Sequence, residues 1–222
     1  MSKVFIIGAA GKVGQRLVKQ LAGRGHEAIA LHRKPEQGSE LAALGVMPVE
    51  ADLLKLDSGK MAQLMSDSDV VVFTAGAGGA GMDLTNAIDG RGLELAVDAA
   101  IQAGIRRFIL VSAFPDALRG SQISEGFENY IAVKKRADAR LMGADLDWVI
   151  VRTGTLLEDT GTGKIRADVT IPHGEVSRDD VAATLAELID QPKVSRVIIE
   201  LTQGDTLVSD AVRRLDRGRC SQ

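Results

Sequence analysis

A tyrosine and a lysine four residues apart are the side chains of this sequence best suited to acid–base chemistry. Tyr130 is the single tyrosine of the chain, and Lys134 follows it in a segment with helical character, so the two share one helix face. A phenol has a pKa near 10, and a neighbouring ammonium group favours its ionised form. The pair is therefore a candidate for proton transfer. The alternative is an ordinary surface helix with a half-buried tyrosine.

A glycine-rich segment near the start of the chain has the spacing of a phosphate-binding turn. Gly8, Gly11 and Gly14 follow an apolar run and open an amphipathic segment, which predicts a strand, a turn and a helix. Gly8 suits the tight turn, Gly11 lets the main chain approach a pyrophosphate, and Gly14 lets the helix pack closely on the strand. The free N–H groups around Lys12 and Val13 are then expected to face the phosphates, with a purely structural turn as the alternative.

The residues after the second apolar run bear on the choice of nucleotide. An NAD site carries an acidic residue roughly 20 positions after the glycines, where it holds the ribose 2′-hydroxyl. This chain has Arg33 and Lys34 in that region and no carboxylate. Two cations would attract a 2′-phosphate, although both could also be solvated loop charges. The sequence therefore favours NADP as the cofactor, with NAD as the alternative.

Further positions at the ends of predicted strands are expected to contact the nucleotide. Asp52, with Leu53 beside it, follows the third apolar run, and its carboxylate can accept a hydrogen bond from the adenine amino group or cap the next helix. Small residues after the fourth run let the main chain lie against the ribose and the nicotinamide. These small residues are Ala75, Gly76 and Ala77, and Ala10 in the glycine turn is expected to contact the nucleotide as well.

The elements that must position these residues follow from the apolar pattern. Seven short runs rich in Val, Ile and Phe cover residues 4–7, 28–31, 46–49, 70–74, 108–112, 148–151 and 197–201. Such runs are typical of parallel strands buried on both faces, and helical periodicities lie between them, such as Val13, Leu17, Leu21 and Leu93, Val97, Ile101. This alternation predicts an α/β fold with a doubly wound parallel sheet.

The domain organisation is expected to be simple. We predict one domain over residues 1–216, with small substrate-side loops at about 113–127 and 153–176 and a disordered tail at 217–222. The segment 161–164 resembles a phosphate loop but lacks the glycine and the Ser/Thr that a Walker sequence needs. Asp179 and Asp180 are expected to begin a helix.

Composition excludes several classes of protein. A net charge of −3 argues against a surface dedicated to nucleic acid or to an anionic membrane, since both need concentrated positive charge. A single cysteine, Cys220, cannot build a disulfide framework, and the three histidines have no metal-ligand spacing, so no metal is expected. No apolar run is long enough for a signal peptide or a membrane span. These features predict a cytoplasmic protein.

The order of these segments resembles the short-chain dehydrogenase/reductase superfamily. The resemblance covers nearly the whole chain and is strongest to small atypical members related to the NAD-dependent epimerase/dehydratase family, namely NmrA-like sensors and proteins similar to biliverdin/flavin reductases. The matching segments are GAAGKVG at 8–14, ADL at 51–53, TAGAG at 74–78, RRFILVSA at 106–113, YIAVK at 130–134, VIVRTG at 149–154 and SRDDVA at 177–182.

This resemblance implies roles for three side chains. Tyr130 would give its phenolic proton to a carbonyl oxygen during hydride transfer, Lys134 would supply a positive field and hold the ribose hydroxyls, and Ser112 would orient the substrate oxygen. Relatives often carry a second serine where this chain has Ala113, and proline where it has Thr153, which is still expected beside the nicotinamide.

The resulting functional expectation is an NADP-dependent oxidoreductase that acts on a small carbonyl, quinone or flavin-like acceptor. A sugar nucleotide is discounted because the larger C-terminal substrate domain of sugar-nucleotide epimerases is missing. The alternative is a non-catalytic NmrA-like redox sensor that binds NAD(P)H and acts through a protein partner. The expected partners are a small-molecule substrate and, as one option, a second copy in a homodimer, without nucleic acid or membrane.

Overall fold

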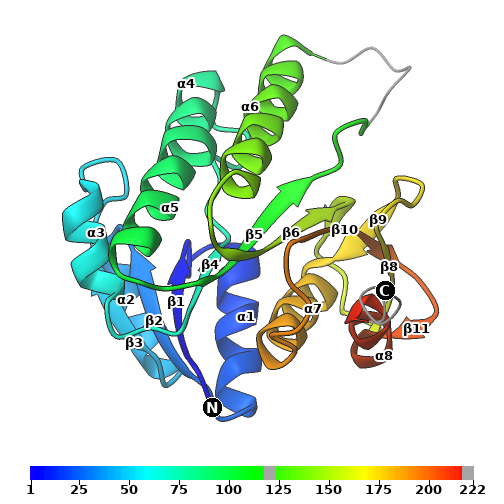
Figure 1. Cartoon of the computed structure of the whole chain (residues 1–222), viewed down its shortest axis with the longest axis horizontal. Helices are drawn as coiled ribbons and strands as arrows, with labels where there is room; N and C mark the ends of the chain where they lie inside the picture. Colours follow the sequence, from blue (N-terminus) through cyan, green and yellow to red (C-terminus); the bar gives the residue numbers. More distant parts are fainter. Residues whose placement is uncertain (118–123, 217–222) are drawn as a thin grey trace.

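Nine strands form a central sheet in the order β11-β8-β10-β6-β5-β4-β1-β2-β3, as the computed structural model of residues 1–117 and 124–216 shows (Figure 1). Seven of them run parallel to one another. These are β1 (Lys3–Ile7), β2 (Glu27–His32), β3 (Met47–Glu50), β4 (Val70–Phe73), β5 (Arg107–Ala113), β6 (Asp147–Thr153) and β10 (Val197–Gln203). Each corresponds to one predicted apolar run. The doubly wound α/β fold is therefore confirmed.

The strands lack polar alternation because both faces of the sheet are covered. In β1, Val4 and Ile6 belong to one hydrophobic core, whereas Phe5 and Ile7 belong to the other. All four side chains are at most 1% exposed. A strand with two buried faces gains stability from every apolar residue along it, which is why the sequence shows continuous runs.

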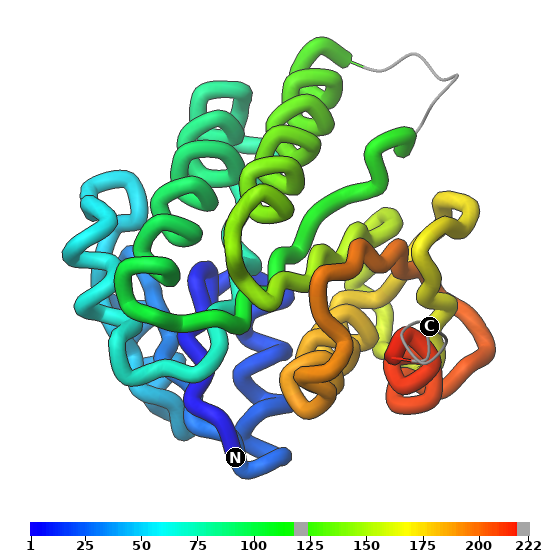
Figure 2. Tube along the Cα trace, in the orientation of Figure 1, coloured from blue at the N-terminus to red at the C-terminus, as the bar shows by residue number. Residues whose placement is uncertain are grey.

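Helices form a layer on each side of the sheet. They are α1 (Lys12–Gly23), α2 (Pro35–Ala43), α3 (Ser58–Met65), α4 (Met82–Thr85), the π-helix η1 (Asn86–Gly92), α5 (Leu93–Gln102), α6 (Glu125–Met142), α7 (Arg178–Asp190) and α8 (Val208–Leu215). The cores place α1, α2, α7 and α8 on one face and α3, α5 and α6 on the other. Figure 2 shows α1 and α7 packed side by side in the first layer.

The predicted periodicity in α5 holds only in part. Leu93 and Val97 are fully buried, but Ile101 is 49% exposed in the last turn of the helix. Among the residues that the structure describes, no helix is both long and apolar enough to cross a membrane.

The late segment 153–176 differs from the expected loop. It contains β7 (Thr155–Leu157), which pairs with β9 (Glu175–Ser177), and β8 (Lys164–Asp168), which pairs antiparallel with β10 and with β11 (Thr206–Leu207). These strands are short and pair with segments distant in the sequence. No local apolar run therefore predicts them. Of the loop predicted at 113–127, residues 118–123 lie outside the described part, as do the predicted tail at 217–222 and Cys220 within it.

Candidate active site

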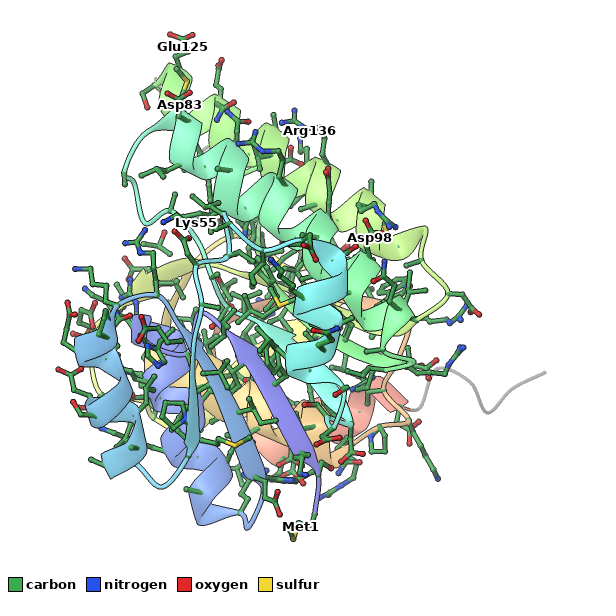
Figure 3. All side chains as sticks on the ribbon, turned by 90° about the vertical axis from the view of Figure 1, so that its left-hand side faces the viewer. Met1, Lys55, Asp83, Asp98, Glu125 and Arg136 are labelled. Atoms are coloured by element: carbon green, nitrogen blue, oxygen red, sulfur yellow. The ribbon has the colours of Figure 1, made fainter. Side chains whose placement is uncertain are left out.

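A cavity of about 1020 Å³ lies at the carboxyl ends of the parallel strands. Figure 3 places Asp83 and Glu125, at the starts of α4 and α6, at the end of the molecule opposite Met1. The neighbouring residues Met82, Ser124 and Gly126 line the cavity at that end. The predicted site residues that line it are Gly8, Ala10, Gly11, Lys12, Val13, Arg33, Asp52, Leu53, Ala75, Gly76, Ala77, Ser112, Tyr130, Lys134 and Thr153. The structure thus brings together nearly all the residues singled out from the sequence.

The glycine turn after β1 leaves no room for side chains. Gly8 has a φ of 90°, and a Cβ there would lie 2.6 Å from the main-chain nitrogen of Ala75. A Cβ on Gly14 would lie 2.3 Å from the carbonyl oxygen of Gly8, so Gly14 allows α1 to pack against the turn and does not itself line the cavity. Thr74 fixes the turn, because its hydroxyl lies 3.1 Å from the carbonyl oxygen of Ile7, to which it donates.

The first turn of α1 is open to an anion. Gly11 is its N-cap, no side chain caps the helix, and its first turn has no acidic residue. The positive end of the helix dipole and the main-chain N–H groups there can therefore bind a phosphate. This opening and the bare glycine turn fit a dinucleotide diphosphate. Lys12 lies at the edge of the site, where its Nζ is 2.6 Å from Glu158 Oε1.

The two cations after β2 take different positions. Arg33 is exposed and lines the cavity, and no hydrogen bond or ion pair of its guanidinium exists within residues 1–117 and 124–216. Lys34 is not a lining residue, and its Nζ lies 3.9 Å from Glu36 Oε1. His32 is buried in the cavity wall, with Nδ1 at 3.0 Å from the carbonyl oxygen of Lys34.

Asp52 does not cap the helix that follows it. Its Oδ1 accepts a hydrogen bond of 3.1 Å from the main-chain nitrogen of Leu54, and Asp57 is the N-cap of α3. The capping alternative for Asp52 is therefore wrong, and its carboxylate lies in the cavity wall. Leu53 packs on η1, since a Cβ on Gly92 would lie 2.8 Å from its Cδ2.

Tyr130 and Lys134 lie on one face of α6, as the spacing predicts. Lys134 is buried, and its Nζ donates to the carbonyl oxygen of Val111 at 3.0 Å and lies 3.3 Å from Asp89 Oδ1. The same Nζ is 6.0 Å from the centre of the Tyr130 ring. The other oxygen of Asp89 accepts from the main-chain nitrogen of Ala77 at 2.9 Å. Asp89 thus connects Lys134 to the loop after β4.

The pKa of Tyr130 is above its ordinary value. Burial raises it first, Lys134 opposes the rise, and the charges of Asp89 and Asp138 add to it. Tyr130 is consequently protonated at neutral pH, which is the state that a proton donor needs.

Ser112 has a buried carboxylate as its partner. Its Oγ donates to Asp138 Oδ1 at 2.6 Å, and the other oxygen of Asp138 accepts from Arg152 Nε at 3.0 Å. The pKa of Asp138 is above its ordinary value, because burial raises it by more than the hydrogen bonds from Ser112 and Arg152 lower it. Thr153, at the end of β6, is buried beside them, and its hydroxyl lies 3.4 Å from the Ser112 carbonyl oxygen.

Asp89 and Asp138 are the site residues that the sequence reasoning missed. Asp138 follows Lys134 by four positions, so the spacing that linked Tyr130 to Lys134 could have found it. Asp89 gives no such signal, because it lies in the π-helix η1, whose geometry shifts the face on which a side chain appears.

The segment that resembles a phosphate loop is occupied by carboxylates of this chain. The main-chain nitrogens of Thr162 and Gly163 donate to Asp180 at 3.0 and 2.8 Å, and that of Gly161 donates to Asp179 at 3.0 Å. Both aspartates lie in the first turn of α7, as expected. These N–H groups are satisfied and do not form a phosphate site.

A doubly wound sheet, an open glycine turn and a Tyr–Lys pair in one cavity define an atypical short-chain dehydrogenase/reductase. The chain belongs to the NAD(P)H-binding family, whose model matches residues 8–192.

Three similar proteins agree with this assignment. The uncharacterized sugar epimerase YhfK from Bacillus subtilis (strain 168) is 38% identical over 215 residues, which span 96% of this chain and 100% of that protein. A Bacillus halodurans structure, named provisionally as an NAD-dependent epimerase/dehydratase, has 33% identity and a TM-score of 0.88 over 96% of this chain and 100% of its own. The anaerobillin reductase ChuY from Escherichia coli O157:H7 has 26% identity and a TM-score of 0.73, covering 91% and 98% of the two chains.

Proposed function

We propose that the protein is an NADP-dependent oxidoreductase that reduces a small carbonyl, quinone or flavin-like acceptor. The observation that carries this proposal is the position of Tyr130, which lines the same cavity as the glycine turn. Its phenol is protonated at neutral pH, because its pKa is raised. ChuY, which is 26% identical, is named a reductase, and this supports a redox reaction over a purely binding role.

The preference for NADP rests on Arg33. Arg33 lines the cavity, while the lining residues directly after β2 include no carboxylate that would repel a 2′-phosphate. A guanidinium binds phosphate in a bidentate manner and holds its charge at every physiological pH. Lys34 lies outside the lining and contributes at most a distant charge.

Each residue of the Tyr–Lys pair has a separate task in the reduction. When bound, the nicotinamide supplies the hydride that adds to the carbonyl carbon. Tyr130 donates its phenolic proton to the carbonyl oxygen and regains a proton from solvent. Lys134, fixed by Val111 and Asp89, stabilises the tyrosinate that forms for a moment.

The experiment that tests this function is NADPH oxidation by the wild type and by Tyr130→Phe, with aldehydes, ketones, quinones and flavins as acceptors. For carbonyls, we expect turnover to fall by roughly 10²- to 10⁴-fold in the variant while NADPH affinity is kept. Phe127→Leu is the matched control, because Phe127 contacts the Tyr130 ring but carries no proton to give.

Other outcomes would separate the alternatives. Turnover of quinones or flavins that Tyr130→Phe leaves unchanged would indicate direct hydride transfer without a side-chain acid. Tight NADPH binding without turnover of any acceptor would contradict the enzyme and favour the NmrA-like sensor.

A further inference from the structure

A row of polar residues crosses three neighbouring strands beneath the cavity. Ser112 on β5 pairs in register with Arg152 on β6, and Arg152 pairs in register with Glu200 on β10. Side chains at paired positions of parallel strands point to the same side of the sheet. The three side chains therefore form a row within the sheet, and Ser112 is its cavity-lining member.

Asp138 joins this row from α6, which covers that side of the sheet. The side chains of Asp138 and Arg152 are 2% and 17% exposed, and Ser112 is 2% exposed. Arg152 Nη1 also lies 4.0 Å from Glu200 Oε1, while Glu200 Oε2 accepts from the main-chain nitrogen of Ile171 at 2.9 Å. Both oxygens of Asp138 thus accept hydrogen bonds, whereas Glu200 accepts one at Oε2 and has only an ion-pair contact with Arg152 at Oε1.

This arrangement fixes the direction of the Ser112 hydroxyl. A hydroxyl has a single hydrogen, and that of Ser112 is donated to Asp138 over 2.6 Å. The groups facing Asp138 are Ser112, Arg152 and, on its own helix, Lys134, and both cations favour the carboxylate form, which accepts hydrogen bonds and donates none. If Ser112 donated to a substrate instead, one buried oxygen of Asp138 would lose its donor, which disfavours that orientation by roughly tenfold or more.

We propose that Ser112 is held as a hydrogen-bond acceptor and selects carbonyl substrates that carry a hydroxyl donor on the neighbouring carbon. Asp138 is the positioning residue. The substrate class is then the α-hydroxy ketones and aldehydes, whose carbonyl oxygen accepts from Tyr130 while their hydroxyl donates to Ser112. This selection rests on the proposed reduction by Tyr130. The direction of the Ser112 hydroxyl hydrogen is independent of that reaction, because it follows from the hydrogen bond to Asp138.

The direction of that hydrogen is tested without any substrate. The side-chain carboxyl carbon of Asp138 is titrated by ¹³C NMR in the wild type and in Ser112→Ala, with Asp138→Asn to assign the signal. We expect an ionised Asp138 at pH 7 and a pKa that rises when the Ser112 donor is removed. A protonated Asp138 at pH 7, or a titration that Ser112→Ala leaves unchanged, would overturn the proposal.

Substrate selection is tested with hydroxyacetone and methoxyacetone, which differ in the donor hydrogen. In the wild type, kcat/KM with NADPH should favour hydroxyacetone by at least about tenfold, and Ser112→Ala should bring the ratio close to one. In Asp138→Asn the amide can donate to Ser112, so the ratio should shift toward methoxyacetone. Ser66→Ala, an exposed serine at the end of α3, should keep the wild-type ratio.

The failure of this proposal is distinguishable from that of the proposed function. Equal use of both ketones, or a ratio that Ser112→Ala does not change, overturns the selection by Ser112 and leaves carbonyl reduction in place. Absence of turnover with both ketones overturns the substrate class, whereas turnover of a quinone or a flavin in the same assay would still support an oxidoreductase.

Discussion

Lys134 and Ser112, two polar residues of the cavity wall, each have a buried aspartate as partner. Asp89 lies 3.3 Å from the ammonium of Lys134, and Asp138 accepts the hydroxyl hydrogen of Ser112. Both aspartates also add negative charge near Tyr130 and raise the pKa of its phenol beyond the effect of burial. The aspartates therefore make Tyr130 lose its proton less readily, in addition to the larger effect of burial and against that of Lys134.

The effect of Asp89 on Tyr130 can be measured from the pH dependence of reduction. In the proposed reduction the active form of Tyr130 is the protonated phenol, so we expect kcat/KM to fall as the pH rises through the pKa of Tyr130. Asp89→Asn removes a charge that raises this pKa, and we expect the alkaline decline to start at lower pH than in the wild type. Asp83→Asn, an exposed aspartate on α4, serves as the control. An unshifted alkaline limb in Asp89→Asn would contradict this electrostatic role.

The sequence predicts candidate residues that are linked by their spacing and does not predict those that join the cavity wall through tertiary contacts. Tyr130 and Lys134 share a helix face, so four-residue spacing was enough to pair them. The sequence could not predict that Arg33 lines the cavity and Lys34 does not. The directions of adjacent loop residues depend on tertiary packing, which no local pattern shows. Asp89 was hidden by the π-helix, in which the regular helical period fails.

At the scale of elements, the junction of β1 and α1 depends on the absence of a single side chain. The space between Gly14 and the carbonyl oxygen of Gly8 is too small for a methyl group. With any residue other than glycine at position 14, α1 could not approach the turn this closely. Thr74, directly after β4, holds the start of this turn through the hydrogen bond from its hydroxyl to the carbonyl oxygen of Ile7. The proposed diphosphate site therefore depends on the packing of β1, α1 and the end of β4.

Substitution of glycine at two positions of the same helix tests this junction. Gly14→Ala must push α1 away from the turn, and we expect a loss of roughly 1–3 kcal/mol in the free energy of unfolding together with weaker NADPH binding. Gly23→Ala, at the end of α1 with nothing within 4 Å of the added methyl, should leave stability unchanged or raise it by up to ~1 kcal/mol. Urea unfolding with and without NADPH measures both effects. Equal stability of the two variants would argue against the close packing.

The elements that could be predicted are those whose signal is local. Six of the seven parallel strands carry several buried residues and stand out, whereas β3 has none that is fully buried, and β7, β9 and β11 are two or three residues long. In β8 the exposed and buried positions alternate, with Ile165 buried between Lys164 and Arg166, which is typical of an edge region. The strands β7, β8, β9 and β11 form because they pair with segments distant in the sequence, and a local pattern does not show such pairing.

At the scale of the whole molecule, α1 and α7 join the beginning and the later part of the chain on one side of the sheet. Arg24 contacts Glu187 at 3.0 Å and Asp190 at 2.6 Å, and His26 Nε2 lies 2.9 Å from the other oxygen of Asp190. Burial opposes the ionisation of Asp190, but the hydrogen bonds from Arg24 and His26 outweigh it and lower the pKa of its carboxyl. This cluster connects the C-terminal end of α1 to the C-terminal end of α7.

The contribution of the cluster should depend on pH. Because the pKa of Asp190 in the folded protein lies below its ordinary value of 3.8, the stabilisation is present above that value and is lost as the pH falls through the folded pKa. We expect Asp190→Asn to lower the free energy of unfolding at pH 7 by at most about 1 kcal/mol, since the carboxylate is 37% exposed. The difference from wild type should shrink below about pH 3. Urea unfolding at several pH values measures it, and a difference that is independent of pH would contradict the assignment.

Calorimetric titration with NADPH and with NADH tests the central claim most directly, because we propose that the glycine turn and Arg33 bind the nucleotide in the cavity. We predict that the wild type binds NADPH at least about tenfold more tightly than NADH. Arg33→Ala should remove most of this preference, whereas Lys34→Ala, which changes a residue outside the cavity lining, should retain it. Equal affinity of the wild type for both nucleotides would contradict the 2′-phosphate site at Arg33. No heat with either nucleotide would contradict the whole account of the cavity.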